Sequence, residues 1–276
     1  MNIRRSVAGQ AMPAETVKLE KDAFRKQDGT TIAWLGGAGI FINARGTNIM
    51  VDPVLEGFDM PLLIDQAITP EEVPVLDAVL ITHIDNDHFS KLTLHDLEAV
   101  TRSIHAPQYV AEDARNDGLS AEGHGIGEHF TVSAAGGAAS DALTVTLTPT
   151  RHNWQNYLPE YNYREWKEED YCGFRIETPD GVIWVPGDSQ PIPALFTQEA
   201  PDAILFDFSD NDWHIGFEGA VKMAATYPDA KLICIHWGTV DAPEFTPFNG
   251  DPERIRAAII NPERLYALAP GELLTL

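Results

Sequence analysis

The chain has 276 residues, of which 44% are hydrophobic, and it carries a formal net charge of −23 at pH 7. This length and composition suit one sizeable globular domain with a real core, and the excess of carboxylates excludes a nucleic acid as the expected partner, because like charges repel. No apolar run is long enough to span a membrane, and two cysteines are too few for a disulfide framework, which together favour a cytoplasmic protein.

The first half of the chain begins with residues 1–25, which lack clear periodicity and which we expect to form a tail or an arm. We expect the remaining residues, 26–276, to form a single domain. Three short apolar segments separated by glycines predict antiparallel strands: TIAWLGG, GIFINARG and TNIMVDP. The segment LDAVLIT then predicts a buried strand, and KLTLHDLEAV and QYVAEDARND have the apolar spacing of helices.

The second half of the chain repeats strand signals before strands begin to alternate with helices. A TPDG turn between two of the segments predicts a hairpin. The order of elements favours two sheets covered by helices. The predicted strands are EHFTVSA, ALTVTLTPT, CGFRIET, GVIWVPG, DAILFDF and KLICIHW, and the predicted helices include FEGAVKMAATYP and DPERIRAAI, whereas GHGIGE is interpreted as a turn.

The stretch ITHIDNDHFS, residues 81–90, places His83, Asp85, Asp87 and His88 within six positions at the end of a predicted strand. Four such side chains repel one another or compete for protons unless a cation lies between them. A lone histidine or aspartate at a strand end is usually a cap or a surface residue, but this cluster indicates a metal site.

Three more candidate ligands follow apolar strands in the same way: His152 follows ALTVTLTPT, Asp188 follows GVIWVPG, and His236 ends KLICIHW. Loops at one end of a rigid sheet are where sites are usually built, so these strand ends are expected to meet. Together with the stretch 81–90 they would collect four histidines and three aspartates. This donor set suits two divalent ions, each with nitrogen and oxygen ligands and an open position for water.

In its motifs, the chain resembles the metallo-β-lactamase superfamily of metal-dependent hydrolases. The resemblance covers residues 30–276 and is nearest to the branch of ascorbate-phosphate lactonase and N-acyl-phosphatidylethanolamine phospholipase D, in which a His-Trp-Gly-Thr ending is familiar. It implies an α/β fold, the αββα sandwich, with the metals at one edge of both sheets. The motifs that carry it are WLGGAGIFINARGTNIMVDP, THIDNDH, RHNW, PGDSQ and IHWGT.

The resemblance also distributes the ligands between the two metals. It implies that the first metal is held by His83, the residue at position 85 and His152, the second by Asp87, His88 and His236, and both by a bridging Asp188.

Position 85 departs from the usual His-x-His-x-Asp-His pattern of the superfamily, because here it is Asp85. A carboxylate is a harder donor than imidazole and shifts the preference from zinc towards manganese or iron. The superfamily's flavodiiron branch also has a carboxylate at this position. The alternative is that Asp85 still binds zinc or leaves the first site weak. We therefore expect two divalent ions, manganese or zinc, with iron as a further option.

The ligand set predicts hydrolysis, in which a metal-bridging hydroxide attacks a carbonyl or phosphoryl centre and a metal stabilises the oxyanion. Asp87 would orient this nucleophile or briefly accept its proton. His214, which lies just before a predicted helix and between two ligand motifs, is a candidate to touch the substrate or to act as an acid. The alternative is a surface histidine at a helix start. The remaining histidines, His95, His105, His124 and His129, are assigned no role.

The segment 152–171 is long, aromatic and polar, and we expect it to form a lid or a wall of the substrate pocket. Within it, Arg164 would pair with a carboxylate or phosphate of a small anionic substrate. The alternative is a contact between subunits of a homo-oligomer, where aromatic residues and arginine are also enriched. The candidate substrate contacts are Trp154, Tyr157, Tyr161, Tyr163, Arg164 and Trp166.

The sequence therefore favours a hydrolase that opens a small lactone or ester. A phosphodiesterase with the same site is the nearest alternative. Two further alternative functions are a di-iron redox protein acting on oxygen or peroxide and a non-catalytic metal-binding sensor.

Overall fold

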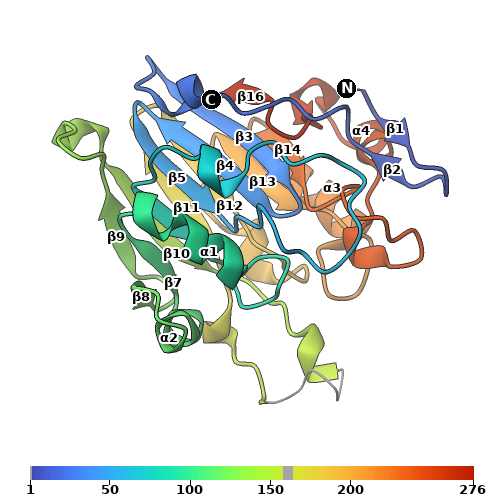
Figure 1. Ribbon diagram of the computed structural model, residues 1–276. Helices are drawn as coiled ribbons and strands as arrows, with labels where there is room; N and C mark the ends of the chain where they lie inside the picture. The colour runs from blue at the N-terminus through green and yellow to red at the C-terminus, as the bar shows by residue number, and fades with distance from the viewer. Residues whose placement is uncertain (1, 158–163) are drawn as a thin grey trace.

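The computed structural model describes residues 2–157 and 164–276. Within them, two seven-stranded sheets pack face to face (Figure 1). The first sheet has the order β16 (Leu273–Thr275), β3 (Thr30–Gly36), β4 (Gly39–Ala44), β5 (Thr47–Val51), β6 (Ala78–Leu80), β7 (Ile104–Pro107) and β8 (Ala121–His124). The second has the order β15 (Leu265–Tyr266), β14 (Lys231–Ile235), β13 (Ala203–Asp207), β12 (Gly181–Val185), β11 (Cys172–Thr178), β10 (Leu143–Pro149) and β9 (His129–Val132).

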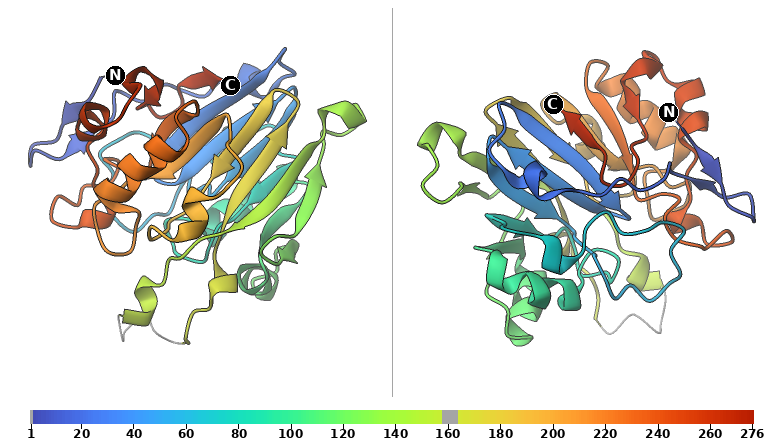
Figure 2. Two further views of the ribbon diagram at one scale, coloured as in Figure 1. Left: turned by 180° about the vertical axis from the view of Figure 1, so that it is seen from behind. Right: turned by 45° about the horizontal axis from the view of Figure 1, so that its top comes forward.

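Helices cover both outer faces of the pair of sheets, as the two views of Figure 2 show. Helices α1 (Lys91–Leu97) and α2 (Gln108–Asn116) pack on the first sheet, and α3 (Gly216–Thr226) and α4 (Pro252–Ala258) pack beside the second. Among the described residues, every helix is too short or too polar to cross a bilayer. The layers are those of the predicted αββα sandwich.

Alternation along the strands divides the apolar side chains between two cores. On β4, Ile40 and Ile42 enter the core between the sheets, whereas Phe41 between them packs beneath the helices. This is the period of two that a pleated strand imposes. Because both faces are covered, all six residues of β4 are buried.

Most of the predicted elements are confirmed. β3, β4 and β5 form the predicted antiparallel start, with Ile32 opposite Ile42 and Ile42 opposite Ile49. The TPDG turn joins β11 to β12. The strands β7 and β8 were not predicted, and the interpretation of GHGIGE as a turn is wrong at its start, because Gly123 and His124 belong to β8. The sequence of β8, AEGH, has no apolar alternation because it is an edge strand.

The N-terminal residues form an arm that lies against the domain. β1 (Arg4–Arg5) pairs with β2 (Ala11–Met12), and further along Phe24 is buried with its ring centroid 4.5 Å from that of Phe41. Where the arm passes Gly238, an added Cβ would lie 2.4 Å from the carbonyl oxygen of Ala11, so only glycine fits.

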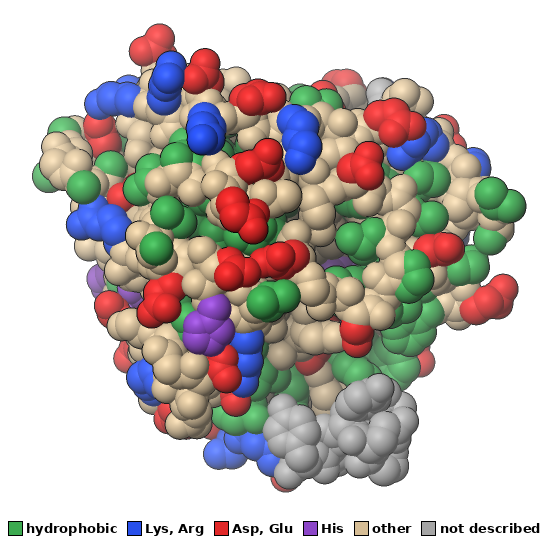
Figure 3. Space-filling view, in the orientation of Figure 1, with side chains coloured by type: hydrophobic (Ala, Val, Ile, Leu, Met, Phe, Trp, Pro, Cys, Tyr) green, Lys and Arg blue, Asp and Glu red, His purple; other side chains and the backbone are tan. Residues whose placement is uncertain are grey.

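The acidic charge is dispersed on one face of the molecule. On the face drawn in Figure 3, aspartate and glutamate side chains are spread over the surface with lysines and arginines between them. Charge dispersed in this way favours solubility and does not mark this face as a binding surface.

We expect Phe174→Ala to lower the free energy of unfolding by about 3–5 kcal/mol, because the side chain is fully buried between the sheets and its removal leaves a cavity. Denaturant unfolding measures the loss. The control Ile260→Ala removes an exposed side chain and should change stability by less than about 0.5 kcal/mol. Equal effects of the two substitutions would contradict this description of the core.

Candidate metal centre

Strand direction brings three of the predicted ligands to one edge of the second sheet. β12, β13 and β14 are parallel, and β10 and β12 run the same way because each is antiparallel to β11. The carboxyl ends of these strands therefore meet, and His152, Asp188 and His236 follow the ends of β10, β12 and β14.

The other ligands come from the first sheet, on the loop after β6. The amide of Thr82 donates to Asp52 Oδ1 at 2.7 Å, and the amide of Cys172 donates to the carbonyl of Thr82 at 3.0 Å, which ties this loop to the second sheet. The amides of His88 and Phe89 both donate to the carbonyl of Asp85, which curls the loop into a tight turn. Its side chains therefore point at the edge of the second sheet.

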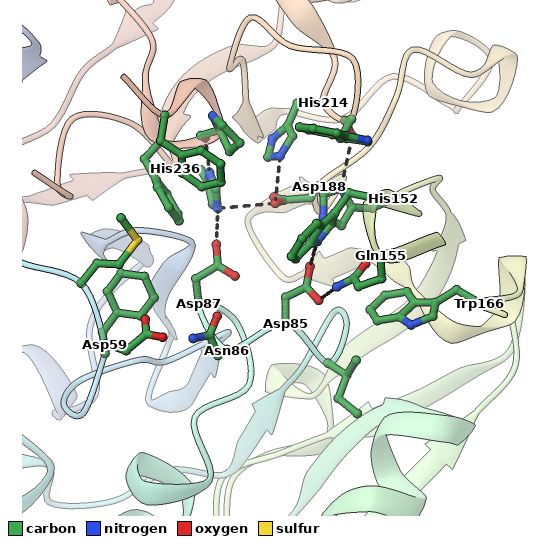
Figure 4. Close-up of a pocket in the computed structure, with 18 residues that line it drawn as sticks. Asp59, Asp85, Asn86, Asp87, His152, Gln155, Trp166, Asp188, His214 and His236 are labelled. Atoms are coloured by element: carbon green, nitrogen blue, oxygen red, sulfur yellow. Dashed lines mark hydrogen bonds and ion pairs between the residues drawn. The ribbon is translucent and has the colours of Figure 1, made fainter. Parts of the chain in front are cut away.

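The seven predicted ligands converge in two groups around Asp188, and Figure 4 shows five of them, Asp85, Asp87, His152, Asp188 and His236. In the first group, Asp85 Oδ2 lies 3.1 Å from His152 Nε2 and 3.3 Å from His83 Nε2. Ligand atoms of His83, His152 and Asp188 all lie within 4.8 Å of one another.

In the second group, His236 Nε2 lies 3.1 Å from Asp87 Oδ2 and 3.4 Å from Asp188 Oδ2, and His88 Nε2 lies 3.1 Å from the same Asp188 oxygen. Ligand atoms of these four residues also lie within 4.8 Å of one another. Asp188 thus adjoins both groups, the place that the predicted bridging ligand requires.

Each of the four histidines is held through Nδ1. His88 donates to Asp52 Oδ2 at 2.8 Å, and the carbonyls of Trp213 and Pro247 accept from His152 and His236, both at 3.2 Å. His83 Nδ1 lies 2.9 Å from the hydroxyl of Thr82, which itself donates to Asp52 and so accepts from the imidazole. Every Nδ1 therefore carries a proton, and every Nε2 turns its lone pair towards the aspartates.

Lone pairs and carboxylates repel at these distances, so cations or protons must lie between them. His83 Nε2 is buried without a hydrogen-bond partner among the described residues. Burial lowers the pKa of the His88, His152 and His236 imidazoles, but nearby carboxylates outweigh burial and raise it. The carboxylate is Asp188 for His88 and His236, and Asp85 for His152. Divalent ions would replace such protons, and the orientation of the histidines through Nδ1 is the one that metal ligands adopt. The residues therefore fit divalent metal ions.

Asp85 is held as firmly as the histidines. The indole Nε1 of Trp154 donates to its Oδ2 at 2.6 Å, and the amide of Gln155 donates to its Oδ1. Burial raises the pKa of Asp85, but His83 and His152 outweigh burial and lower it, so the side chain is an ionised ligand. Trp154, a predicted substrate contact, thus supports a ligand besides lining the pocket.

Three supporting residues were not predicted: Asp52, Asp207 and Gln155. Asp52, after β5, accepts hydrogen bonds from both Thr82 and His88, and it adopts a left-handed backbone with φ of 45°. Asp207 ends β13 at the same sheet edge as the ligands and pairs with His214. Both follow buried strands, the signal that identified Asp188, whereas nothing local marks Gln155.

The candidate acid His214 lies beside the metal ligands. Its Nδ1 donates to Asp207, and its Nε2 lies 3.8 Å from Asp188 Oδ2. Burial lowers the pKa of His214 well below its usual value. The imidazole is therefore neutral at pH 7 and faces the pocket with an unprotonated Nε2.

A cavity of about 420 Å³ opens over the ligands. Of the predicted substrate contacts, Trp154 and Trp166 line it, whereas Arg164 does not: its guanidinium pairs with Asp170 and lies 3.8 Å over the ring of Tyr109. The side chain of Tyr157 and all of Tyr161 and Tyr163 lie outside the described residues. Besides the ligands, the lining includes Phe58, Asp59, Met60, Ile84, Asn86, Trp213, Phe245, Pro247 and Phe248.

A family model described as the beta-lactamase superfamily domain matches residues 47–237. The chain belongs to this family. A UPF0173 metal-dependent hydrolase of Caldivirga maquilingensis is 23% identical over 252 residues, which cover 89% of this chain and 97% of the relative. The predicted superfamily is confirmed, whereas the narrower lactonase and phospholipase branch stays a prediction.

Solved structures of this superfamily fold confirm the predicted architecture. Igni18, a metallo hydrolase of the archaeon Ignicoccus hospitalis, matches with a TM-score of 0.68 and 18% identity, over 90% of this chain and 98% of its own. An isothiocyanate hydrolase from Delia radicum gut bacteria matches with a TM-score of 0.69 and 17% identity, over 89% of this chain and 98% of its own.

We expect Asp188→Asn to remove metal from both groups, because Asp188 adjoins both and the amide offers no charge. Plasma mass spectrometry measures metal per chain, and circular dichroism checks the fold. The control Asp210→Asn changes an exposed carboxylate outside the pocket and should keep its metal. An Asp188→Asn protein with full metal content would exclude the shared role.

We expect Asp52→Asn to weaken metal binding by about 10–100-fold, because His88 and Thr82 lose the charge that orients them. Competition with a chelator measures the affinity. Asp77→Asn is the matched control: Asp77 is also buried and accepts from the amide of Asn48, away from the metal ligands. Asp77→Asn should lower stability without changing the metal affinity. Equal metal affinities in the two variants would argue against the role of Asp52.

Proposed function

We propose that this protein is a metal-dependent hydrolase that opens a small, uncharged ester or lactone. One observation carries the proposal: four Nε2 lone pairs and three carboxylates converge beside a cavity large enough for a metabolite, and five of these seven side chains line it. Membership of the superfamily and the metal-dependent hydrolases among its relatives support it.

The residues would divide as the two groups do: His83, Asp85 and His152 for one ion, Asp87, His88 and His236 for the other, and Asp188 for both. Divalent ions held there would lower the pKa of water and polarise a scissile carbonyl. We propose manganese, zinc or iron, because carboxylate and imidazole donors suit all three.

The chain's own groups would then move protons. Asp87 is the most accessible of the ligands and faces the cavity, so it can orient an attacking water and take its proton. His214 lies on the other side of Asp188 with its Nε2 free of a proton, and Asp207 fixes its tautomer. The attacking water has two protons: Asp87 can take the first, and His214 can take the second from the tetrahedral adduct and return it to the leaving alkoxide, which is general acid–base catalysis.

The lining argues for a neutral substrate rather than the anionic one expected from the sequence. No lysine or arginine is among the described lining residues, and residues 158–163, Leu-Pro-Glu-Tyr-Asn-Tyr, contain none. Arg164 is bound to Asp170, so it does not supply the expected anion partner. Three ligand carboxylates also offset most of the charge of two divalent ions.

The walls supply apolar surface instead. Phe58, Trp166, Trp213 and Phe248 line the cavity together with Met60. Aromatic walls with a few convergent polar groups are typical of sites for small organic molecules. We therefore expect an aromatic or aliphatic body beside the scissile carbonyl. The isothiocyanate named for one structural relative is a neutral substrate of this kind.

Asp85 favours a second candidate function, a di-iron redox protein acting on oxygen or peroxide, because carboxylate-rich sites suit iron. It predicts oxygen consumption with iron and no hydrolysis with any of the three metals.

The substrate test compares three aryl compounds of matched size: a neutral lactone or ester, its carboxylated analogue, and a phosphodiester. Each is assayed with protein loaded with zinc, manganese or iron. We expect the highest kcat/KM for the neutral compound. A preference for the carboxylated analogue would overturn the proposed neutrality, and a preference for the phosphodiester would favour the phosphodiesterase. Oxygen consumption without hydrolysis would favour the redox protein, and full metal content without any turnover would favour the sensor.

We expect His214→Gln to lower kcat by about 10²–10⁴-fold while metal content stays unchanged, because His214 moves protons without belonging to either ligand group. Metal analysis and kinetics are read from the same preparation. The control His95→Gln changes a histidine that pairs with Asp117 away from the pocket and should keep full activity. Unchanged kcat in His214→Gln would exclude the acid–base role, and loss of metal would make His214 a ligand.

A further inference from the structure

A second group of candidate ligands lies on the first sheet, outside the pocket. His105 on β7 is paired across the parallel ladder with Glu122 on β8, and His124 follows Glu122 by two positions. Residues two apart on a strand share a face, so the three side chains project on the same side. β8 is the edge strand of this sheet (Figure 1). None of the three lines the cavity described above.

The three ligand atoms are close and their orientation is fixed. His105 Nδ1 lies 2.9 Å from His124 Nε2, and together with a carboxylate oxygen of Glu122 they all lie within 4.8 Å of one another. The ring of Phe130, on β9 of the other sheet, stacks on both imidazoles at centroid distances of 4.0 and 4.4 Å. His105 is buried, whereas Glu122 is exposed, so an ion can enter from solvent.

Hydrogen bonds fix the tautomer of His105. The hydroxyl of Ser103 donates to the carbonyl of Asp77 at 3.0 Å, so it must accept from His105 Nε2, which lies 2.9 Å away. The proton of His105 is therefore on Nε2, and the lone pair of Nδ1 points at His124. Burial, helped by His124, lowers the pKa of His105 to about 4, and burial also lowers the pKa of His124. Both imidazoles are neutral at pH 7, as metal ligands must be.

We propose that His105, Glu122 and His124 form a separate zinc site at this edge of the sandwich. Two imidazoles and one carboxylate are a zinc donor set, with the fourth position left for water. Zinc–nitrogen bonds of about 2.0–2.1 Å place two nitrogens of a tetrahedral site about 3.3 Å apart, so the histidine pair needs to open by only a few tenths of an ångström. His124 would shift its proton to Nδ1, and zinc would take the place of the proton between the rings. The ion would then join the edge strand to its neighbour.

The test uses zinc chloride with the whole protein, dialysed to equilibrium, and counts zinc per chain by plasma mass spectrometry. We expect His124→Ala to bind one zinc fewer than the parent, and Glu122→Gln to bind this zinc at least about tenfold more weakly. Hydrolytic activity should be unchanged in both, since neither residue contacts the pocket. The parent should also gain thermal stability at zinc concentrations above those that fill the central site, and His124→Ala should not.

The matched control is His95→Ala, which removes another histidine outside the pocket and should leave the zinc count unchanged. Glu122 is exposed, so Glu122→Gln is expected to fold even if His124→Ala does not. Equal zinc counts and affinities in the parent and Glu122→Gln would overturn the proposal and leave His105 and His124 as a hydrogen-bonded pair that closes the sheet edge.

Discussion

The site depends on one electrostatic constraint: carboxylates and imidazole lone pairs are buried together and face one another at about hydrogen-bond distance. Such an arrangement is unfavourable unless positive charge lies between the groups, because burial removes the water that would otherwise solvate them. The chain reinforces the constraint by fixing the proton of each histidine on the far nitrogen. Asp52 is central to this, since it orients His88 directly and His83 through the hydroxyl of Thr82.

The architecture follows from the need to bring these groups together. Parallel strands end at the same edge, so β12, β13 and β14 deliver Asp188, Asp207 and His236 side by side. The backbone meets this need with local strain and close approaches. His236 adopts a left-handed φ of 59°, and at Gly187, with φ of 71°, an added Cβ would lie 2.7 Å from the carbonyl oxygen of Cys172. Strained residues of this kind gather at functional sites, where the surrounding structure holds them in place.

The sequence was informative at several places where a buried strand ends in a polar residue, although Asp52 and Asp207, which show the same pattern, were assigned no role. This signal found His152, Asp188 and His236, and the structure brings them to the stretch 81–90 as expected. It failed where the partner of a side chain depends on the path of an irregular loop. That Arg164 pairs with Asp170 rather than facing the pocket depends on how the segment folds back.

Two other features lay beyond sequence patterns for related reasons. His105 and His124 meet because β7 and β8 are parallel neighbours separated by α2, and AEGH has no strand pattern that would have placed His124 beside His105. Gln155 supports Asp85 from a short 3₁₀ turn, where no periodicity links a side chain to its target.

The most direct test of the central claim is anomalous diffraction from crystals of the protein grown with manganese or zinc, measured at the absorption edge of the metal. Two anomalous peaks should appear in the central site, one contacted by Nε2 of His83 and His152 and the other by Nε2 of His88 and His236, with Asp188 touching both. A single peak, or ions bound through Nδ1, would contradict a two-metal centre built on histidines whose protons are fixed on Nδ1.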